Sequence, residues 1–150
     1  SSVSGGHPHD IRHVSFELRG PHLDPADVTR IVGISPDRVD AAGDLKRSGS
    51  PFDHGRWSVH SGLAKDAEIH DHLEALLGRL RPRWAAFIEL GRRYDAQVWA
   101  SVDMRDPGYS GPPIAVLPHV AAAFAEINSR IVFDISKSPP ASETLRPAAG

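Results

Sequence analysis

The run from Trp57 to Tyr94 constrains the fold of this chain more than any other part of the sequence. It opens with RWSVHSG, in which apolar and polar residues alternate as they do in a strand with one buried face. Apolar residues at helical spacing follow from Ala67 onward, namely Ile69, Leu73, Leu76, Leu77 and Leu80. Pro82 cannot continue that helix without a kink but is favoured at a helix start, and a second apolar stripe follows it. The run therefore predicts a strand and two helices that are hinged at this proline.

Alternating apolar residues predict further strands, at residues 11–19, 96–104 and 131–135. A short helix is expected to begin at Asp24-Pro25, because aspartate is a favoured N-cap and proline a favoured first helical residue. Gly33 is the expected end of that helix.

Two shorter apolar runs are also interpreted as strands. Residues 45–47 lie in a stretch rich in Ser, Pro, Asp and Gly and are the one candidate for an edge strand there. Residues 114–117 are expected to open a final strand-helix-strand unit, whose helix carries the stripe from Val120 to Ile127.

The order of these segments predicts an α+β fold. Its first six elements match a ferredoxin-like split βαβ core, in which helices cover one face of an antiparallel sheet, and a C-terminal βαβ unit extends this core. The SSVSGGHPHD start is small, polar and Gly-rich, and the KSPPASETLRPAAG end carries Pro and Ser. We therefore expect a flexible arm over residues 1–10, a single domain over residues 11–136 and a flexible tail over residues 137–150.

Composition narrows the classes of function. A chain of 150 residues with 40% hydrophobic and 24% charged residues suits one globular domain, and its formal net charge of −2 predicts no overall attraction to nucleic acid. The absence of cysteine excludes disulfides, thiolate zinc sites and cysteine nucleophiles. No apolar run approaches the roughly 20 residues that span a bilayer, and the first residues do not resemble a signal peptide. A cytoplasmic protein without membrane contact is the simplest expectation.

Three segments carry a resemblance to a known family: FELRGPHLDPADVTRIVGISPD, RWSVHSG leading into DHLEALLGRL, and PIAVLPHVAAAFAEINSRIVFDIS. They resemble the bacterial domain-of-unknown-function family 4279 over most of residues 14–136. The resemblance implies a small α+β bacterial domain without an established enzymatic activity, so it supplies no catalytic residue. Trp57 and His72 are the positions most similar to landmarks of the family, and both are candidate ligand-binding residues.

One face of the predicted sheet collects chemically varied side chains. If the apolar residues of each strand face the helices, His13, Glu17, His60 and Asp103 lie on the opposite face with Trp99 and Ser101. A histidine beside a carboxylate can act as a general acid or base, which makes the first four of these residues the catalytic candidates. Trp99 offers a flat ring for a ligand, and Trp99, Ser101 and His60 join the ligand-binding candidates. The alternative is that this face is simply the solvated side of an antiparallel sheet.

The histidines do not predict a metal site. His70 and His72 stand two positions apart on a helix and point in roughly opposite directions, so they cannot bind one ion together. A neutral core histidine with one hydrogen bond is the simpler interpretation of His72, and His7 and His9 lie in the predicted arm. We expect neither a metal nor a cofactor.

Basic residues gather near the ends of the paired helices, namely Arg79, Arg81, Arg83, Arg92 and Arg93. Such a cluster could receive phosphate, nucleic acid or an acidic partner. Cations near helix C-termini are also ordinary complements of the helix dipole, so nucleic acid is not the expected partner.

The leading hypothesis is a non-enzymatic binding module of bacterial origin that recognises a protein partner through an open sheet face. An immunity or accessory protein of a bacterial gene cluster is an example of such a module. The alternative is a small cofactor-free enzyme or small-ligand-binding protein that uses His13, Glu17, His60 and Asp103 around Trp99. For this alternative, the side chains must line one concave pocket. An unpaired edge strand could also join two copies into a homodimer.

Overall fold

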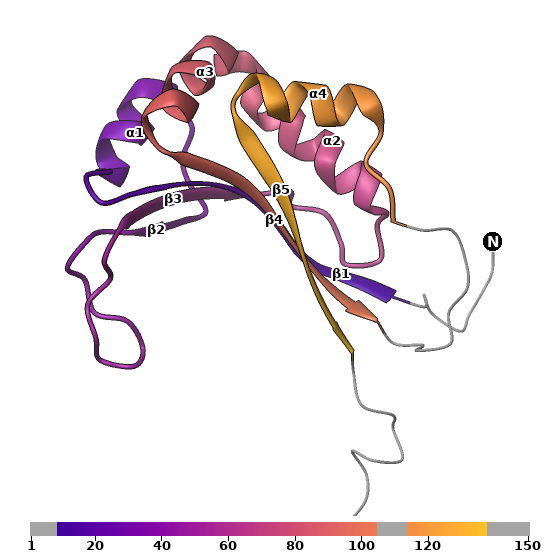
Figure 1. Cartoon of the computed structure of the whole chain (residues 1–150), viewed down its shortest axis with the longest axis horizontal. Coiled ribbons are helices and arrows are strands. Elements are labelled where there is room, and N and C mark those ends of the chain that lie inside the picture. Colours follow the sequence, from indigo (N-terminus) through magenta and orange to yellow (C-terminus); the bar gives the residue numbers. More distant parts are fainter. Residues whose placement is uncertain (1–8, 105–113, 138–150) are drawn as a thin grey trace, which may run out of the picture.

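The computed structural model describes residues 9–104 and 114–137, and it shows a five-stranded sheet with helices on one face (Figure 1). The strands are β1 (His9–Gly20), β2 (Arg38–Asp40), β3 (Gly55–His60), β4 (Asp95–Met104) and β5 (Ser129–Lys137). The helices are α1 (Pro25–Val32), α2 (Ile69–Leu80), α3 (Trp84–Arg93) and α4 (Pro118–Glu126). A 3₁₀ turn over Arg81–Arg83 joins α2 to α3, so the predicted hinge at the proline is confirmed. The α+β class is also confirmed.

The strands lie in the order β2-β3-β1-β4-β5. β1 is antiparallel to both of its neighbours, β3 and β4, and β2 is antiparallel to β3. β5 is parallel to β4, which requires a crossover connection, and α4 lies in that connection. The element order of the core is the predicted β-α-β-β-α-β, with α3 continuing α2. The C-terminal βαβ unit uses β4 itself as its first strand.

Two predicted strands are wrong. Residues 114–117 precede α4 without forming a strand, and the neighbours of β4 in the sheet are β1 and β5. The edge strand is Arg38–Asp40 instead of residues 45–47. Leu45 forms only an isolated bridge to Pro51, inside a loop where the Lys46 amide donates to the Ser50 carbonyl at 2.7 Å. Local turn bonds therefore replace a sheet ladder in that segment.

The boundaries of α1 follow from its caps. The Asp24 side chain accepts a hydrogen bond from the Ala26 amide at 3.1 Å, and Pro25 takes the first helical position. Gly33 ends the helix at φ 68°, a left-handed conformation that glycine adopts without strain. The predicted start and end of this helix are confirmed.

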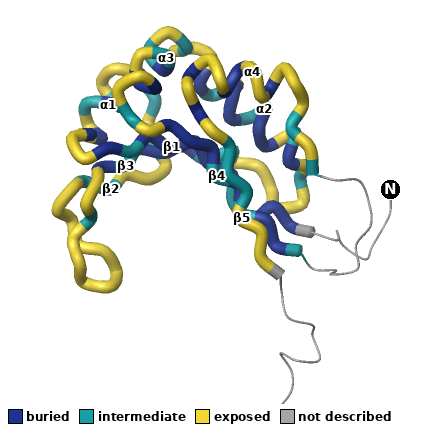
Figure 2. The backbone as a smooth tube through the Cα atoms, viewed as in Figure 1, coloured by how far each residue is buried: buried dark blue, intermediate teal, exposed yellow. Residues whose placement is uncertain are grey.

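The core lies between the sheet and the helices, where buried residues concentrate (Figure 2). Phe87 of α3 packs against two strand residues, Phe16 with ring centroids 5.7 Å apart and Trp57 with centroids 5.9 Å apart. The Trp57 indole also donates a hydrogen bond to the Thr29 hydroxyl at 3.0 Å. All four helices lie on this side of the sheet, and no described helix covers the opposite face (Figure 1). We call that opposite side the open face.

β1 begins at His9, so the last two residues of the predicted arm belong to a strand. The rest of the arm, residues 105–113 and residues 138–150 of the predicted tail lie outside the described residues. Across the described ranges, no helix has the length and apolar character needed to cross a membrane.

Candidate binding site on the open face

A chain of polar contacts crosses the open face and takes one side chain from each strand. Arg130 Nε donates to Gln97 Oε1 at 3.2 Å, and Gln97 Nε2 donates to Glu17 Oε1 at 3.1 Å. Arg56 continues the chain, with one guanidinium nitrogen 3.5 Å from Glu17 Oε2 and its Nε 3.2 Å from Asp40 Oδ2. We call this series the polar ladder. It fixes the side chains before any ligand binds, because each one is held by its neighbour on the next strand.

The ladder lies on the open face because of strand alternation. Phe16 and Leu18 are fully buried against the helices, so Glu17 between them points the other way. Glu17 and Gln97 are nevertheless only 8% and 5% exposed. Burial of a carboxylate is costly unless the charge is paired and hydrogen-bonded. Arg56 and Gln97 meet that requirement for Glu17.

A hollow of about 240 Å³ lies against the ladder, and we call it the Trp99 hollow. Its lining residues are His13, Glu17, Arg19, Arg38, Arg56, Gln97 and Trp99. Three arginines against one glutamate give it an excess of positive charge, and the half-buried Trp99 adds a flat apolar wall. Guanidinium groups bind carboxylates and phosphates through paired hydrogen bonds. The hollow therefore suits an anionic group carried beside an apolar or flat one.

Two histidines lie at one end of the Trp99 hollow. The rings of His13 and His60 are 4.4 Å apart between centroids and meet edge to face at 81°. Burial lowers the pKa of His13, the positive charge that His60 can carry lowers it further, and Glu17 acts in the opposite direction. His13 is consequently neutral at pH 7 and is available as a hydrogen-bonding group.

A second hollow of about 260 Å³, which we call the Ser61 hollow, shares His13 and adjoins the first. Its other lining residues are Arg12, Val14, His60, Ser61, Gly62, Leu63 and His72. The Ser61 hydroxyl oxygen lies 2.6 Å from His72 Nδ1, and His72 is 1% exposed. Burial lowers the pKa of His72. His72 is thus a buried histidine hydrogen-bonded to one side chain, as its place in the apolar stripe of the helix predicts.

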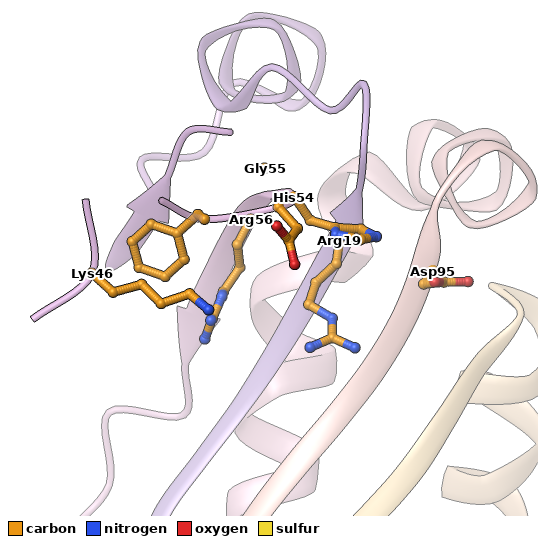
Figure 3. Close-up of a pocket in the computed structure, with 8 residues that line it drawn as sticks. Arg19, Lys46, His54, Gly55, Arg56 and Asp95 are labelled. Atoms are coloured by element: carbon orange, nitrogen blue, oxygen red, sulfur yellow. The ribbon is translucent and has the colours of Figure 1, made fainter. Parts of the chain in front are cut away.

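A third hollow, of about 370 Å³, lies at the other end of the open face (Figure 3), and we call it the Arg19 hollow. Its lining residues are Arg19, Lys46, Phe52, Asp53, His54, Gly55, Arg56 and Asp95. Arg19 and Arg56 also line the Trp99 hollow, and they are direct neighbours across β1 and β3. The three hollows are therefore linked in a row by shared residues.

The structure brings some of the predicted site residues together and separates others. His13, Glu17 and Trp99 line one hollow, His60 contacts His13 from the next hollow, and Ser101 is the cross-strand neighbour of His13.

Three other candidates lie apart from the Trp99 hollow. Asp103 is near the end of β4, opposite Asp10 and 3.9 Å from the Arg12 guanidinium. Trp57 is fully buried in the core, where it cannot touch a ligand on the open face. His72 lines the Ser61 hollow and not the Trp99 hollow.

Sequence reasoning missed the arginines of the open face. Arg19 follows Glu17 by two positions on β1, and Arg56 precedes Ser58 by two on β3. Extending the period-two alternation by one step would have placed both on this face. The contribution of Arg38 could not be found in this way, because its strand was not predicted.

Two arginines of the predicted helical cluster have structural partners. Arg79 donates to Asp37 Oδ2 at 2.6 Å and to the His60 carbonyl at 2.8 Å, and Arg92 pairs with Glu89 at 2.7 Å. Burial acts to raise the pKa of Asp37, but hydrogen bonds from the His60 amide and Arg79 outweigh it, so the pKa is lowered. Within residues 9–104 and 114–137, no group of three His, Asp or Glu side chains could hold a metal ion.

The family model described as "Domain of unknown function (DUF4279)" matches residues 9–138. The chain belongs to this DUF4279 family. The matched range contains every helix and strand described above and the lining residues of all three hollows. No curated protein matches the chain, and no solved structure matches it. The description of the DUF4279 family assigns no activity, so a function has to be argued from the site itself.

Proposed function

We propose that this DUF4279 domain is a non-enzymatic binding module that holds an acidic segment of a protein partner against the open face of its sheet. The observation that carries the proposal is the Trp99 hollow, in which Arg19, Arg38 and Arg56 surround an aromatic ring and one glutamate. The side chains stand on strands and are linked by the polar ladder, so little ordering is needed on binding.

Binding is favoured over catalysis because the candidate acid–base groups are dispersed. His13 and Glu17 are four residues apart on one strand, which separates their Cα atoms by about 13 Å. Glu17 is already engaged by Gln97 and Arg56, and Asp103 lines none of the three hollows. A catalytic histidine is oriented by a partner within hydrogen-bond reach, and in the described part of the chain no carboxylate is hydrogen-bonded to the ring of His13 or His60.

An acidic segment fits the shape and charge of the face. The hollows adjoin one another in a row, which suits an extended chain, and the Trp99 hollow has two more cations than anions among its lining side chains if its histidine is neutral. Charge complementarity of this kind gives specificity and speeds association.

A small carboxylate ligand is the second candidate. The observation that favours it is the size of the Trp99 hollow, because its volume of about 240 Å³ is close to the smallest volumes usual for small-molecule sites.

Amide chemical-shift mapping tests the proposal. A hexaglutamate peptide with a central tryptophan and a small aromatic carboxylate, indole-3-acetate, are titrated separately into the labelled domain. We expect the peptide to shift the resonances of His13, Gln97 and Trp99, and Trp99→Ala to weaken its binding by about tenfold or more, since a buried aromatic contact dominates many interfaces.

The matched control is Trp84→Ala, because Trp84 lies in the helical layer, half buried, and bonds Glu126 there. This variant should keep the affinity for the peptide. Shifts confined to the helical layer, or equal affinities of the two tryptophan variants, would rule out the open face. Stronger binding of indole-3-acetate than of the peptide would favour the small-ligand candidate instead.

The biological setting stays a prediction. A role as an immunity or accessory protein of a bacterial gene cluster, and a cytoplasmic location, rest on the sequence alone. The homodimer also stays a prediction, which light scattering would test.

A further inference from the structure

We infer that the Arg19 hollow is a binding site for a phosphomonoester dianion. The inference rests on the proposed function, because the hollow forms one end of the same open face. It adds the chemistry of the group recognised there.

Two arginines with like charge lie side by side in the lining of the Arg19 hollow. Arg19 and Arg56 stand directly opposite each other on β1 and β3, and like charges in this position destabilise a sheet. Arg56 is partly neutralised by Glu17 and Asp40. The side chain of Arg19, in contrast, forms no hydrogen bond or ion pair with any residue in the described part of the chain. An anion bound between the two guanidinium groups would remove their repulsion.

Cationic side chains outnumber carboxylates in the lining of the Arg19 hollow. Three cations, Arg19, Lys46 and Arg56, line it with two carboxylates, Asp53 and Asp95. Asp95 is the neighbour of Arg19 on the β4 side, yet it lies apart from the three cations (Figure 3). A phosphomonoester carries close to two negative charges and three acceptor oxygens, and guanidinium forks match that geometry. The cations of the hollow exceed its carboxylates by one, and its three donor side chains match the three acceptor oxygens of a phosphate better than the two of a carboxylate.

The loop between β2 and β3 supplies Lys46 and Phe52 to the Arg19 hollow. Residues 41–54 project from the sheet on the side away from the helices (Figure 1). The loop is closed by backbone hydrogen bonds, from the Gly43 amide to the Phe52 carbonyl at 2.9 Å and from the Phe52 amide to the Asp44 carbonyl at 2.7 Å. Lys46 Nζ lies 5.8 Å from the centre of the Phe52 ring. The loop thus offers both a cation for the phosphate and an apolar wall for the group that bears it.

The position of the hollow also predicts a spacing in the partner. Ser15 is the cross-strand neighbour of Trp99 and lies four residues before Arg19 on β1, a distance of about 13 Å. An extended peptide advances by about the same distance per residue as a β-strand does. A phosphorylated residue over Arg19 would therefore place the residue about four positions away over Trp99.

Calorimetric titration with phenyl phosphate tests the inference, and inorganic phosphate and benzoate serve as comparison ligands. Phenyl phosphate should bind more tightly than either, because it has both the dianion and the ring. Arg19→Gln should weaken its binding by about 10- to 100-fold, the range for loss of hydrogen bonds to a charged group. Arg30→Gln removes the same charge from the exposed surface of α1 and should leave the binding unchanged.

Thermal unfolding without phosphate separates recognition from a structural role. Arg19→Gln should melt no lower than the unsubstituted domain at low ionic strength, because the repulsion from Arg56 is removed. Phosphate should raise the melting temperature of the unsubstituted domain more than that of the variant. Equal affinities of Arg19→Gln and Arg30→Gln for phenyl phosphate would overturn the inference.

A peptide with phosphotyrosine four positions from a tryptophan distinguishes the source of the phosphate. Tighter binding than phenyl phosphate indicates a phosphorylated partner chain, and equal binding indicates a small phosphorylated molecule. Loss of phenyl phosphate binding in Arg19→Gln, combined with unchanged binding of the acidic peptide in Trp99→Ala, would uphold this inference while refuting the proposed function. Unchanged binding of phenyl phosphate in Arg19→Gln, combined with weaker binding of the acidic peptide in Trp99→Ala, would refute this inference and leave the proposed function standing.

Discussion

At the scale of single residues, buried His72 links the stability of the domain to pH. Burial lowers its pKa below the usual 6.5, so the folded state resists protonation at a pH where the unfolded chain accepts a proton. The free energy of unfolding should therefore fall as the pH drops below about 6.5. His13 acts in the same direction, because its pKa is lowered as well. The pKa of Asp37 is lowered from 3.8, so its contribution to the free energy of unfolding is lost only in more acidic solution.

The first prediction isolates His72. In urea unfolding at pH 7, 6 and 5, His72→Phe should lose less stability on acidification than the unsubstituted domain does, since the variant has no buried imidazole. Asp37→Asn is the control, because it should alter the pH dependence only below about pH 4. An unchanged slope between pH 7 and 5 in His72→Phe would show that His72 does not carry the effect.

At the scale of elements, α3 approaches the turn before β5 so closely that one helical position must be glycine. A Cβ on Gly91 would lie 2.0 Å from the Ile127 carbonyl oxygen, and Asn128 Nδ2 donates to the Gly91 carbonyl at 3.0 Å. Asn128 itself has φ 60°, a left-handed conformation that asparagine tolerates better than most residues. Backbone contact, rather than side-chain packing, therefore sets the spacing of these two segments.

The second prediction compares two helical glycines. Gly91→Ala should lower the free energy of unfolding by about 1–3 kcal/mol, because the added methyl group has no space and the backbone must move. Gly78→Ala should raise it by about 0.5–1 kcal/mol, because Gly78 has open space around it and alanine favours the helix. Urea unfolding of both variants measures the difference. A gain in stability in both would contradict the close contact.

At the scale of the whole molecule, the polar ladder ties the antiparallel core to the C-terminal unit across all five strands. Glu17 is its central member, since it contacts Gln97 on β4 and Arg56 on β3. The ladder lies on the face that no described helix covers, so it supports the sheet where apolar packing does not. The same contacts hold the binding side chains in place, which joins stability and recognition in one set of residues.

The third prediction removes that central member. Glu17→Ala should lower the free energy of unfolding by roughly 1–3 kcal/mol, because it leaves the buried Gln97 and the partly buried Arg56 without their shared partner. Glu89→Ala is matched in charge and breaks an exposed pair with Arg92, so it should cost less than about 1 kcal/mol. Equal losses in urea unfolding would mean that the ladder adds little to stability.

Most of the helices and strands, and the direction of most of their side chains, follow from local patterns in the sequence. Asp24 and Gly33 mark the ends of α1 through their own chemistry, and the alternation in β1 and β4 places His13, Glu17 and Trp99 on one face. These features depend on residues that are close in the chain, because a helix or strand repeats every few residues.

Which strands are neighbours, and which side chains therefore meet, depends on the fold of the whole chain. Arg19 and Arg56 face each other although 37 positions separate them, and Asp40 joins the ladder from a strand that no local pattern predicted. The candidate landmark Trp57 lies in the core, and residues 114–117 find no free edge beside β4. Register and strand order depend on how the whole sheet packs under its helices, and a short sequence window does not contain that information.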